Sequence, residues 1–333
     1  MVNPPNPDYR AERVGIFNVG VDFAMTNGRI NGNVEFYNKE AKDLVALANI
    51  DPTTGFYTQA VNIANFRNQG VELNLQSTNI VAGDYKWNSN LIFTYGKSVV
   101  TKYNYKHSSV SSYMWATTAP NPVVGRDLYG LYAFRFAGLD HETGAPLGYY
   151  NGEVSQDYSR IMSVGIEDVN YMGSSVPLYS GFLANTFSWR SWSLRANLQY
   201  KLKYFYRRQS INYNGLAQYW QMQDDFNLRW KKPGDEMHTN VPAFIYPMNG
   251  QRDQFYQNSE VLIEPADHVR LKDINLQYQL NLHSKSFKSI QLYVNADNLN
   301  LMLWRKSKYK NDPDFNFLIP TPKLYTIGAK ASF

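Results

Sequence analysis

Apolar and polar residues alternate along several stretches of the chain, most regularly over residues 325–333. One face of this stretch carries Tyr325, Ile327, Ala329, Ala331 and Phe333, and the other carries Thr326, Gly328, Lys330 and Ser332. A period of two predicts a β-strand whose faces meet two different environments. A strand with lipid on one face and a polar lumen on the other has this pattern.

The same alternation predicts eight more strands, mostly paired in hairpins. They cover residues 14–25, 30–36, 71–76, 85–95, 183–189, 192–200, 274–280 and 290–296. Their polar faces are rich in Asn, Gln and Ser, which suits a crowded, hydrated lumen. An ordinary antiparallel sheet protein also alternates, so the pattern alone leaves that fold open.

The connections between these strands alternate in length. The short ones are residues 26–29, 79–84, 190–191 and 281–287, and the long ones are 40–68, 98–180, 204–265 and 302–320. Short turns at one rim and long loops at the other are typical of outer-membrane barrels, with the periplasm on the short side. The fold class that we expect is therefore all-β, part of an antiparallel transmembrane barrel with long extracellular loops.

The connection at residues 98–180 contains a further strand signal at residues 129–139. Counted as a barrel strand, it would place the tight turn at 190–191 on the wrong rim. Residues 140–144 have the composition of a hairpin turn, so residues 145–150 can pair antiparallel with residues 129–139. We therefore predict a hairpin within a long outer loop and keep the number of barrel strands at nine.

Composition narrows the alternatives. The chain has no cysteine, which excludes disulfides and thiolate chemistry. No apolar run reaches the ~18–20 residues of a transmembrane helix, and the net charge of +5 argues only weakly for an anionic partner. The first residues do not resemble a secretory signal. Since an outer-membrane protein needs one, we expect the chain to be the end part of a longer protein.

We find no catalytic constellation in the sequence. The five His are scattered without ligand spacing, and the acid-poor strands offer no facing carboxylates of the kind that a β-rich glycosidase needs. The pairs Asp224–Asp225 and Asp312/Asp314 offer oxygens to Ca²⁺, but solvated loop acids are the better interpretation. The run KLKYFYRR at residues 201–208 has the basic and aromatic mixture of single-strand nucleic-acid binders. Its place at the end of a strand favours an anchor at the membrane interface.

The best candidates for ligand contact are aromatic residues of the long loops. Flat rings stack on sugars or peptides and lose little conformational entropy. Packing inside the loops, or against a partner protein, explains such rings equally well. The candidates are Tyr113, Trp115, Tyr219, Trp220 and Trp230.

A series of short motifs runs along the chain. They are 6–8 (NPD), 17–23 (FNVGVDF), 42–44 (KDL), 65–73 (NFRNQGVEL), 124–125, 132, 135–140 with 143–144, 173–177 (GSSVP), 230–235 (WKKPGD) with 239–242 (TNVP), 270–272 (RLK), 298–299, 312–313 and Phe333. Each motif alone is weak, but their order covers nearly all 333 residues. In this order they resemble the motifs of the SusC/RagA family of TonB-dependent outer-membrane transporters of Bacteroidetes, although Ala64 replaces a Gly that the family usually has near residues 65–73.

The resemblance implies a closed barrel of ~22 strands around an amino-terminal plug. Residues 1–333 would then be the carboxy-terminal part of the barrel, with the plug, the TonB-contacting segment and the signal peptide outside this chain. It also implies a non-enzymatic nutrient importer for oligosaccharides or peptides, energised through TonB and working with a SusD-like lipoprotein. Neither a cofactor nor a nucleic acid is implied. A soluble β-rich carbohydrate-binding or adhesion module is the alternative.

The family also implies a role for Phe333 as the signal that the barrel assembly machinery recognises. We expect that deleting Phe333 from the full-length protein will lower the amount of assembled barrel in the outer membrane. Membrane fractionation with a heat-modifiability gel measures this amount. Normal barrel levels after the deletion would remove this interpretation.

Overall fold

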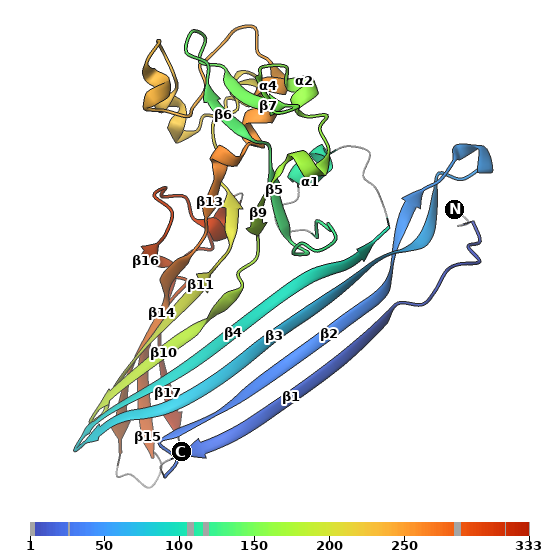
Figure 1. Cartoon of the computed structure of the whole chain (residues 1–333). Helices are drawn as coiled ribbons and strands as arrows, with labels where there is room; N and C mark the ends of the chain where they lie inside the picture. Colours follow the sequence, from blue (N-terminus) through green and yellow to red (C-terminus); the bar gives the residue numbers. More distant parts are fainter. Residues whose placement is uncertain are drawn as a thin grey trace.

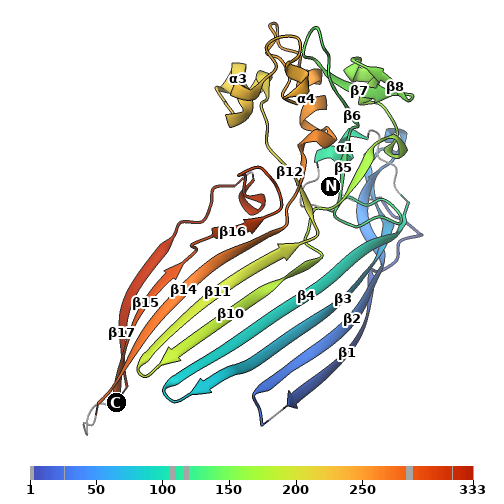
Figure 2. The same cartoon turned by 60° about the vertical axis from the view of Figure 1, so that its left-hand side comes forward.

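The computed structural model describes residues 4–25, 27–104, 110–115, 120–282, 288–316 and 318–332. It consists of a large curved antiparallel sheet and a loop assembly above one end of that sheet (Figure 1). We use "loop assembly" for residues 110–115, 120–178 and 203–267. The opposite end of the sheet carries the short turns, and the chain ends there (Figure 2). Predicted residue Phe333 lies outside the described residues.

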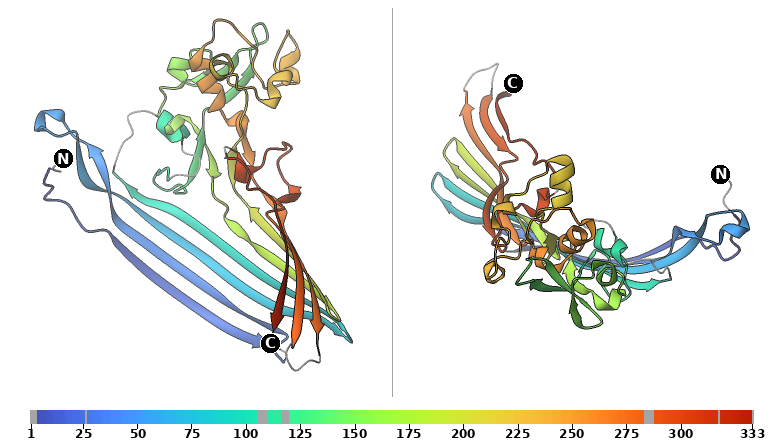
Figure 3. Two further views of the ribbon diagram at one scale, coloured as in Figure 1. Left: turned by 180° about the vertical axis from the view of Figure 1, so that it is seen from behind. Right: turned by 90° about the horizontal axis from the view of Figure 1, so that it is seen from above.

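The large sheet has the order β1-β2-β3-β4-β10-β11-β14-β15-β17, with β16 also paired to β14. Seen from above, it forms an open arc with β1 and β17 at the two ends (Figure 3). The nine strands along this path confirm the predicted fold class and strand number. Their bounds are β1 (Arg13–Met25), β2 (Ile30–Asn49), β3 (Thr58–Ala82), β4 (Tyr85–Tyr103), β10 (Tyr179–Trp189), β11 (Trp192–Leu202), β14 (His268–Asn281), β15 (Ser289–Asp297) and β17 (Leu324–Ser332), and β16 is Leu301–Arg305.

The prediction of a long loop over residues 40–68 was wrong. Strands β2 and β3 stay paired as far as Asn49 and Thr58, so the connection shrinks to residues 50–57. The register shifts on both sides of Leu44, and Asp43 has a φ of 58°. Such a bulge breaks the period of two, which explains why alternation did not detect these strands. Strand β16 similarly occupies part of the loop predicted at 302–320.

The predicted hairpin within the outer loop is half correct. Strand β6 (Phe136–Leu139) pairs with β7 (Pro146–Tyr150) as expected, and β7 continues to β8 (Glu153–Ser155). The first part of the predicted strand instead forms β5 (Gly130–Ala133), which pairs with β9 (Asn170–Ser174). Between β5 and β6, Phe134 bonds through its backbone to residues 258 and 260, so the chain changes partners at this point.

The two faces of the large sheet differ in chemistry. On one face, Val21, Val34, Leu73 and Phe93 lie side by side across four strands. The other face carries amide side chains that bond across strands, such as Gln291 to Gln277 at 2.7 Å and Asn197 to Asp273 at 2.8 Å. Many large apolar side chains of the sheet are exposed, whereas the buried apolar clusters lie in the loop assembly. The sheet therefore exposes its apolar face rather than packing it into a core.

The loop assembly has a packed core of its own. Phe255 is fully buried, stacks on Tyr158 at 5.6 Å and packs against Phe134 at 6.1 Å between ring centres. No described helix is long and apolar enough to cross a membrane. The remaining elements are α1 (Ser111–Trp115), α2 (Tyr158–Ile161), α3 (Tyr213–Tyr219), α4 (Gly250–Gln257), β12 (Phe205–Arg207), β13 (Ile263–Pro265), and the 3-10 turns η1 (Pro52–Thr54), η2 (Ile166–Asp168), η3 (Asp224–Leu228), η4 (Asp235–Met237), η5 (Glu260–Leu262) and η6 (Pro313–Phe315).

Three tyrosines of the sheet each lie over a glycine on the neighbouring strand. The directly opposed pairs are Tyr37 with Gly70, Tyr200 with Gly181, and Tyr293 with Gly328. A Cβ on any of these glycines would come within 2.5 Å of the tyrosine hydroxyl oxygen. At Gly181 it would also lie 1.9 Å from the carbonyl oxygen of Ile92, which accepts the Tyr200 hydroxyl bond at 2.9 Å. Glycine is needed here because another group closely approaches the backbone.

We expect Gly181→Ala to destabilise the sheet by about 1–3 kcal/mol, because backbone atoms cannot move away from the new methyl group. The temperature at which the full-length barrel unfolds in detergent, followed on a heat-modifiability gel, should fall. Gly15→Ala on β1 is the matched control, since a Cβ there meets nothing within 4 Å. Equal unfolding temperatures for the two variants would contradict the steric argument.

Candidate functional site

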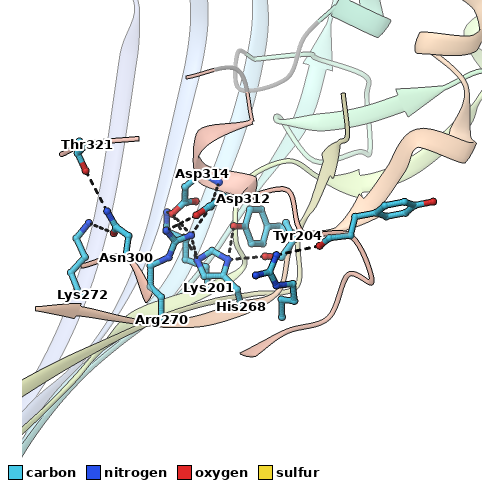
Figure 4. A network of polar contacts seen from close by, with 12 residues as sticks. Lys201, Tyr204, His268, Arg270, Lys272, Asn300, Asp312, Asp314 and Thr321 are labelled. Carbon is cyan, nitrogen blue, oxygen red and sulfur yellow. Dashed lines mark hydrogen bonds and ion pairs between the residues drawn. The ribbon is translucent and has the colours of Figure 1, made fainter. Parts of the chain in front are cut away.

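A network of charged side chains connects the segment before β17, at Asp312 and Asp314, to strands β11 and β14. Arg270 of β14 donates to both oxygens of Asp312, at 3.1 and 2.8 Å, and lies 3.1 Å from Asp314. Lys201 of β11 donates to both oxygens of Asp314 at 2.9 Å (Figure 4). Two cations and two carboxylates therefore compensate each other. The RLK and DP motifs, 42 residues apart, meet in this network.

His268 continues this network into the protein interior through its contact with Arg270. Its side chain is fully buried. The Nε2 atom lies 2.9 Å from Arg270, which can only donate, so Nε2 accepts. The Nδ1 atom lies 2.9 Å from the carbonyl oxygen of Ala266 and therefore carries the proton. These partners hold His268 as the neutral Nδ1–H tautomer, and Tyr204 lies beside it with its hydroxyl 3.3 Å from Nδ1.

The loop assembly encloses a cavity of about 800 Å³, which we call the loop pocket. Its lining residues come from α1, from the end of β12 and the segment after it, from the segment after α3, from the end of α4 and from η5. Six of the lining side chains are carboxamides, two are arginines, and none is acidic. Trp220 lies on the pocket wall and is 88% exposed. The pocket thus combines hydrogen-bonding amides, an accessible aromatic ring and positive charge.

The two arginines of the loop pocket differ in their partners. Arg208 lies 3.0 Å from Asp225 and stacks over Tyr309 at 4.1 Å. Within the described residues, Arg207 donates to the carbonyl oxygens of Gln257 at 3.1 Å and Tyr132 at 2.7 Å and to no carboxylate. Burial without a carboxylate lowers the pKa of Arg207 to about 10. Both arginines belong to the basic and aromatic run at residues 201–208, in which Tyr204, Tyr206 and the two arginines are buried while Lys203 is exposed.

The aromatic residues predicted to contact a ligand differ in their exposure to solvent. Tyr219 and Trp220 are 68% and 88% exposed, and Trp220 reaches the loop pocket. Tyr113 and Trp230 are buried, so their rings pack within the loop assembly. The side chain of Trp115 lies outside the described residues. Burial could not be read from the sequence, because the loops showed no periodicity that separates inner from outer rings.

Trp230 joins two of the family-like motifs. Its ring lies against Gly144, whose φ is 63° and where a Cβ would come within 2.3 Å of the indole. The indole nitrogen donates to Glu236 at 3.0 Å, and His141 lies 2.6 Å from the other oxygen of that carboxylate. The bonds from His141 and Trp230 lower the pKa of Glu236 to about 2. The segments 140–144 and 230–236 therefore hold each other in place.

Three of the four acids considered for Ca²⁺ are engaged by other groups, and Asp224 is exposed. Asp225 accepts bonds from Arg208, Ser210 and the backbone of Ile211. Asp312 and Asp314 are engaged by Arg270 and Lys201, as described above. Within the described ranges, no group of three or more His, Asp or Glu side chains is placed to hold a metal ion.

Comparison with known proteins finds relatives of this chain among TonB-dependent receptors. No family model matches the chain. The TonB-dependent receptor P26 of Formosa agariphila is 21% identical over 99% of this chain and 35% of its own length. The TonB-dependent receptor SusC of Bacteroides thetaiotaomicron is 31% identical over 29% of this chain and 10% of its own. The solved RagAB peptide transporter superimposes over 100% of this chain and 37% of its own, with 26% identity and a TM-score of 0.77.

The chain is similar over its whole length to TonB-dependent receptors of the SusC/RagA family. A solved RagAB peptide importer in the closed-closed state gives a similar match, with 26% identity and a TM-score of 0.75. The chain spans a little over a third of the length of receptor P26 and of the RagAB chains that it matches. This similarity places the chain in the outer membrane, and the large sheet corresponds to part of the barrel of a SusC/RagA receptor. The names of these relatives describe receptors and transporters rather than enzymes.

The network around Arg270 generates a prediction about the segment at residues 306–323. Burial alone would raise the pKa of Asp314, but the bond and charge of Lys201, with Arg270, lower it overall. We expect Asp314→Asn to cost about 2–4 kcal/mol, because Lys201 and Arg270 lose a partner. Hydrogen exchange of this segment should then become faster. Asp224→Asn is the control, since Asp224 is exposed and makes none of the ion pairs found among the described residues.

The lowered pKa also fixes the direction of the pH dependence. The contribution of Asp314 is complete above the ordinary carboxyl value of about 4. It disappears as the pH falls through the lowered folded value. Exchange in segment 306–323, corrected for its intrinsic pH dependence, should therefore rise below about pH 4 in the wild type and less in Asp314→Asn. Equal protection in both proteins at pH 7 would refute the role of this network.

Proposed function

We propose that this chain forms the carboxy-terminal part of the barrel of an outer-membrane importer that takes up short peptides. The remaining strands, the plug, the segment that contacts TonB and the signal peptide belong to sequence outside the chain. Transport is energised through TonB, and a SusD-like lipoprotein covers the extracellular side. The chain itself contributes barrel wall, extracellular loops and no catalytic group.

The observation that carries this proposal is the match to the RagAB peptide transporter over the whole chain. The match includes the loop assembly as well as the strands, since all 333 residues are covered. The exposed apolar face of the sheet supports contact with lipid. Strands β1 and β17 each pair with one neighbour among the described strands. Such edges are completed in a closed barrel by further strands.

Peptides are the favoured substrate class for two reasons. Two solved relatives of 26% identity are named as a peptide transporter and a peptide importer. The loop pocket also presents carboxamide side chains, which donate to and accept from peptide groups alike. Oligosaccharides are the second candidate, because exposed aromatic rings such as that of Trp220 can stack on sugars.

Growth of a strain that lacks the complete receptor gene tests the substrate class. We expect the strain to lose growth on short peptides as the sole nitrogen source and to keep growth on oligosaccharides. Complementation with the intact gene should restore growth, and removal of TonB should abolish it again. Loss of growth on an oligosaccharide alone would favour the second substrate class.

The location of the protein separates the importer from the alternative of a soluble β-rich module. The receptor should fractionate with the outer membrane, require detergent for extraction and co-purify with a lipoprotein encoded nearby. A monomer that remains in water without detergent and unfolds cooperatively would support the soluble module and reject the importer.

A further inference from the structure

Arg207 is a buried cation at the wall of the loop pocket with no anionic partner in the described part of the chain. Its side chain is 7% exposed, and its Nε atom has no hydrogen-bond partner. The two carbonyl oxygens that it contacts carry only partial charge. Uncompensated buried charge is costly and is therefore usually paired. The neighbouring Arg208 shows the usual arrangement, since Asp225 neutralises it.

The positive charge of Arg207 is not neutralised by the residues that line the loop pocket, so it can attract an anion there. None of the residues that line the pocket is acidic. Solvent screening is weak at a buried site, so the charge acts over several ångströms without direct contact. A ligand carboxylate placed among the amides would gain this attraction and hydrogen bonds together.

We propose that the loop pocket binds the carboxylate groups of short acidic peptides, with Arg207 as the source of positive charge. This inference rests on the proposed function and adds a charge preference to it. Gln221, Gln223 and Gln257 line the same pocket and would donate to the carboxylate or to the peptide backbone. The exposed ring of Trp220 would cover an apolar part of the peptide. Because Arg207 is itself tied to two carbonyl groups, it acts as a fixed charge rather than as a mobile arm.

Binding should be measured by calorimetry with the complete receptor in detergent. One probe is a short peptide with Glu side chains and a free carboxyl end. A second has Gln in place of Glu and an amidated end. A short oligogalacturonate, which carries carboxylates on a sugar chain, is the third. We expect the acidic peptide to bind at least about tenfold more tightly than its neutral counterpart, which corresponds to about 1.4 kcal/mol.

The test variant places a negative charge in the pocket without altering a buried residue. In Gln223→Glu, the new carboxylate compensates Arg207, so the preference for the acidic peptide should fall to about threefold or less, whereas the neutral peptide should bind as before. Gln218→Glu makes the same chemical change on exposed α3 outside the pocket lining and should keep the full preference. Trp220→Ala should weaken both peptides.

Each outcome bears on the inference. An equal affinity for both peptides, an unchanged preference in Gln223→Glu, or pocket-dependent binding of the oligogalacturonate alone would overturn it. A receptor that binds no peptide at all would contradict the proposed function as well. A receptor that binds both peptides equally, unaffected by changes at Trp220 and Gln223, would retain the proposed function and lose only the role of the loop pocket.

Discussion

The pairing of backbone groups between neighbouring strands is the constraint on which the whole structure depends. Among the described residues, the clusters of buried apolar side chains lie in the loop assembly, whereas most large apolar side chains of the sheet point outward and its other face is lined with amides. Its cohesion therefore comes from the hydrogen-bonded ladders and from the surroundings of each face. Strands β2 and β3 continue this pairing through the segment that their sequence suggested was a long loop. The loop assembly is held by different forces, namely buried aromatic rings and compensated charges.

Alternation and loop length were sufficient to predict the nine strands, their hairpins and the end of the sheet at which the loops gather. They failed where the period of two is interrupted. The bulge at Asp43 shifts the register, so residues on either side no longer share one pattern. At Phe134 the chain changes partners between two small sheets, which no local signal marks. Both failures arise because pairing depends on a distant segment.

The sequence indicated which types of residue would form the candidate site, but not which of those residues would line it. Loop aromatics were proposed as ligand contacts, and Trp220 does reach the loop pocket. The burial of Tyr113 and Trp230 follows from tertiary packing that composition does not reveal. The run at residues 201–208 showed its charge in the sequence but not its partners. Only the fold shows that Arg208 meets Asp225 while Arg207 meets backbone oxygens. The motifs around Arg270 and Asp312 were likewise noted separately before the fold joined them.

The three tyrosines that lie over glycines have a consequence for how strands find their partners. Alternation forbids a slip by one residue, because every side chain would change face. It does not forbid a slip by two, and a sheet without a packed core has little else to penalise that error. A slip of two would place Tyr37, Tyr200 or Tyr293 opposite a residue that has a side chain. At Tyr200 that residue would be Leu183 or Tyr179, whose side chains occupy the space that the ring needs. These pairs therefore favour the correct register between neighbouring strands during assembly of the barrel.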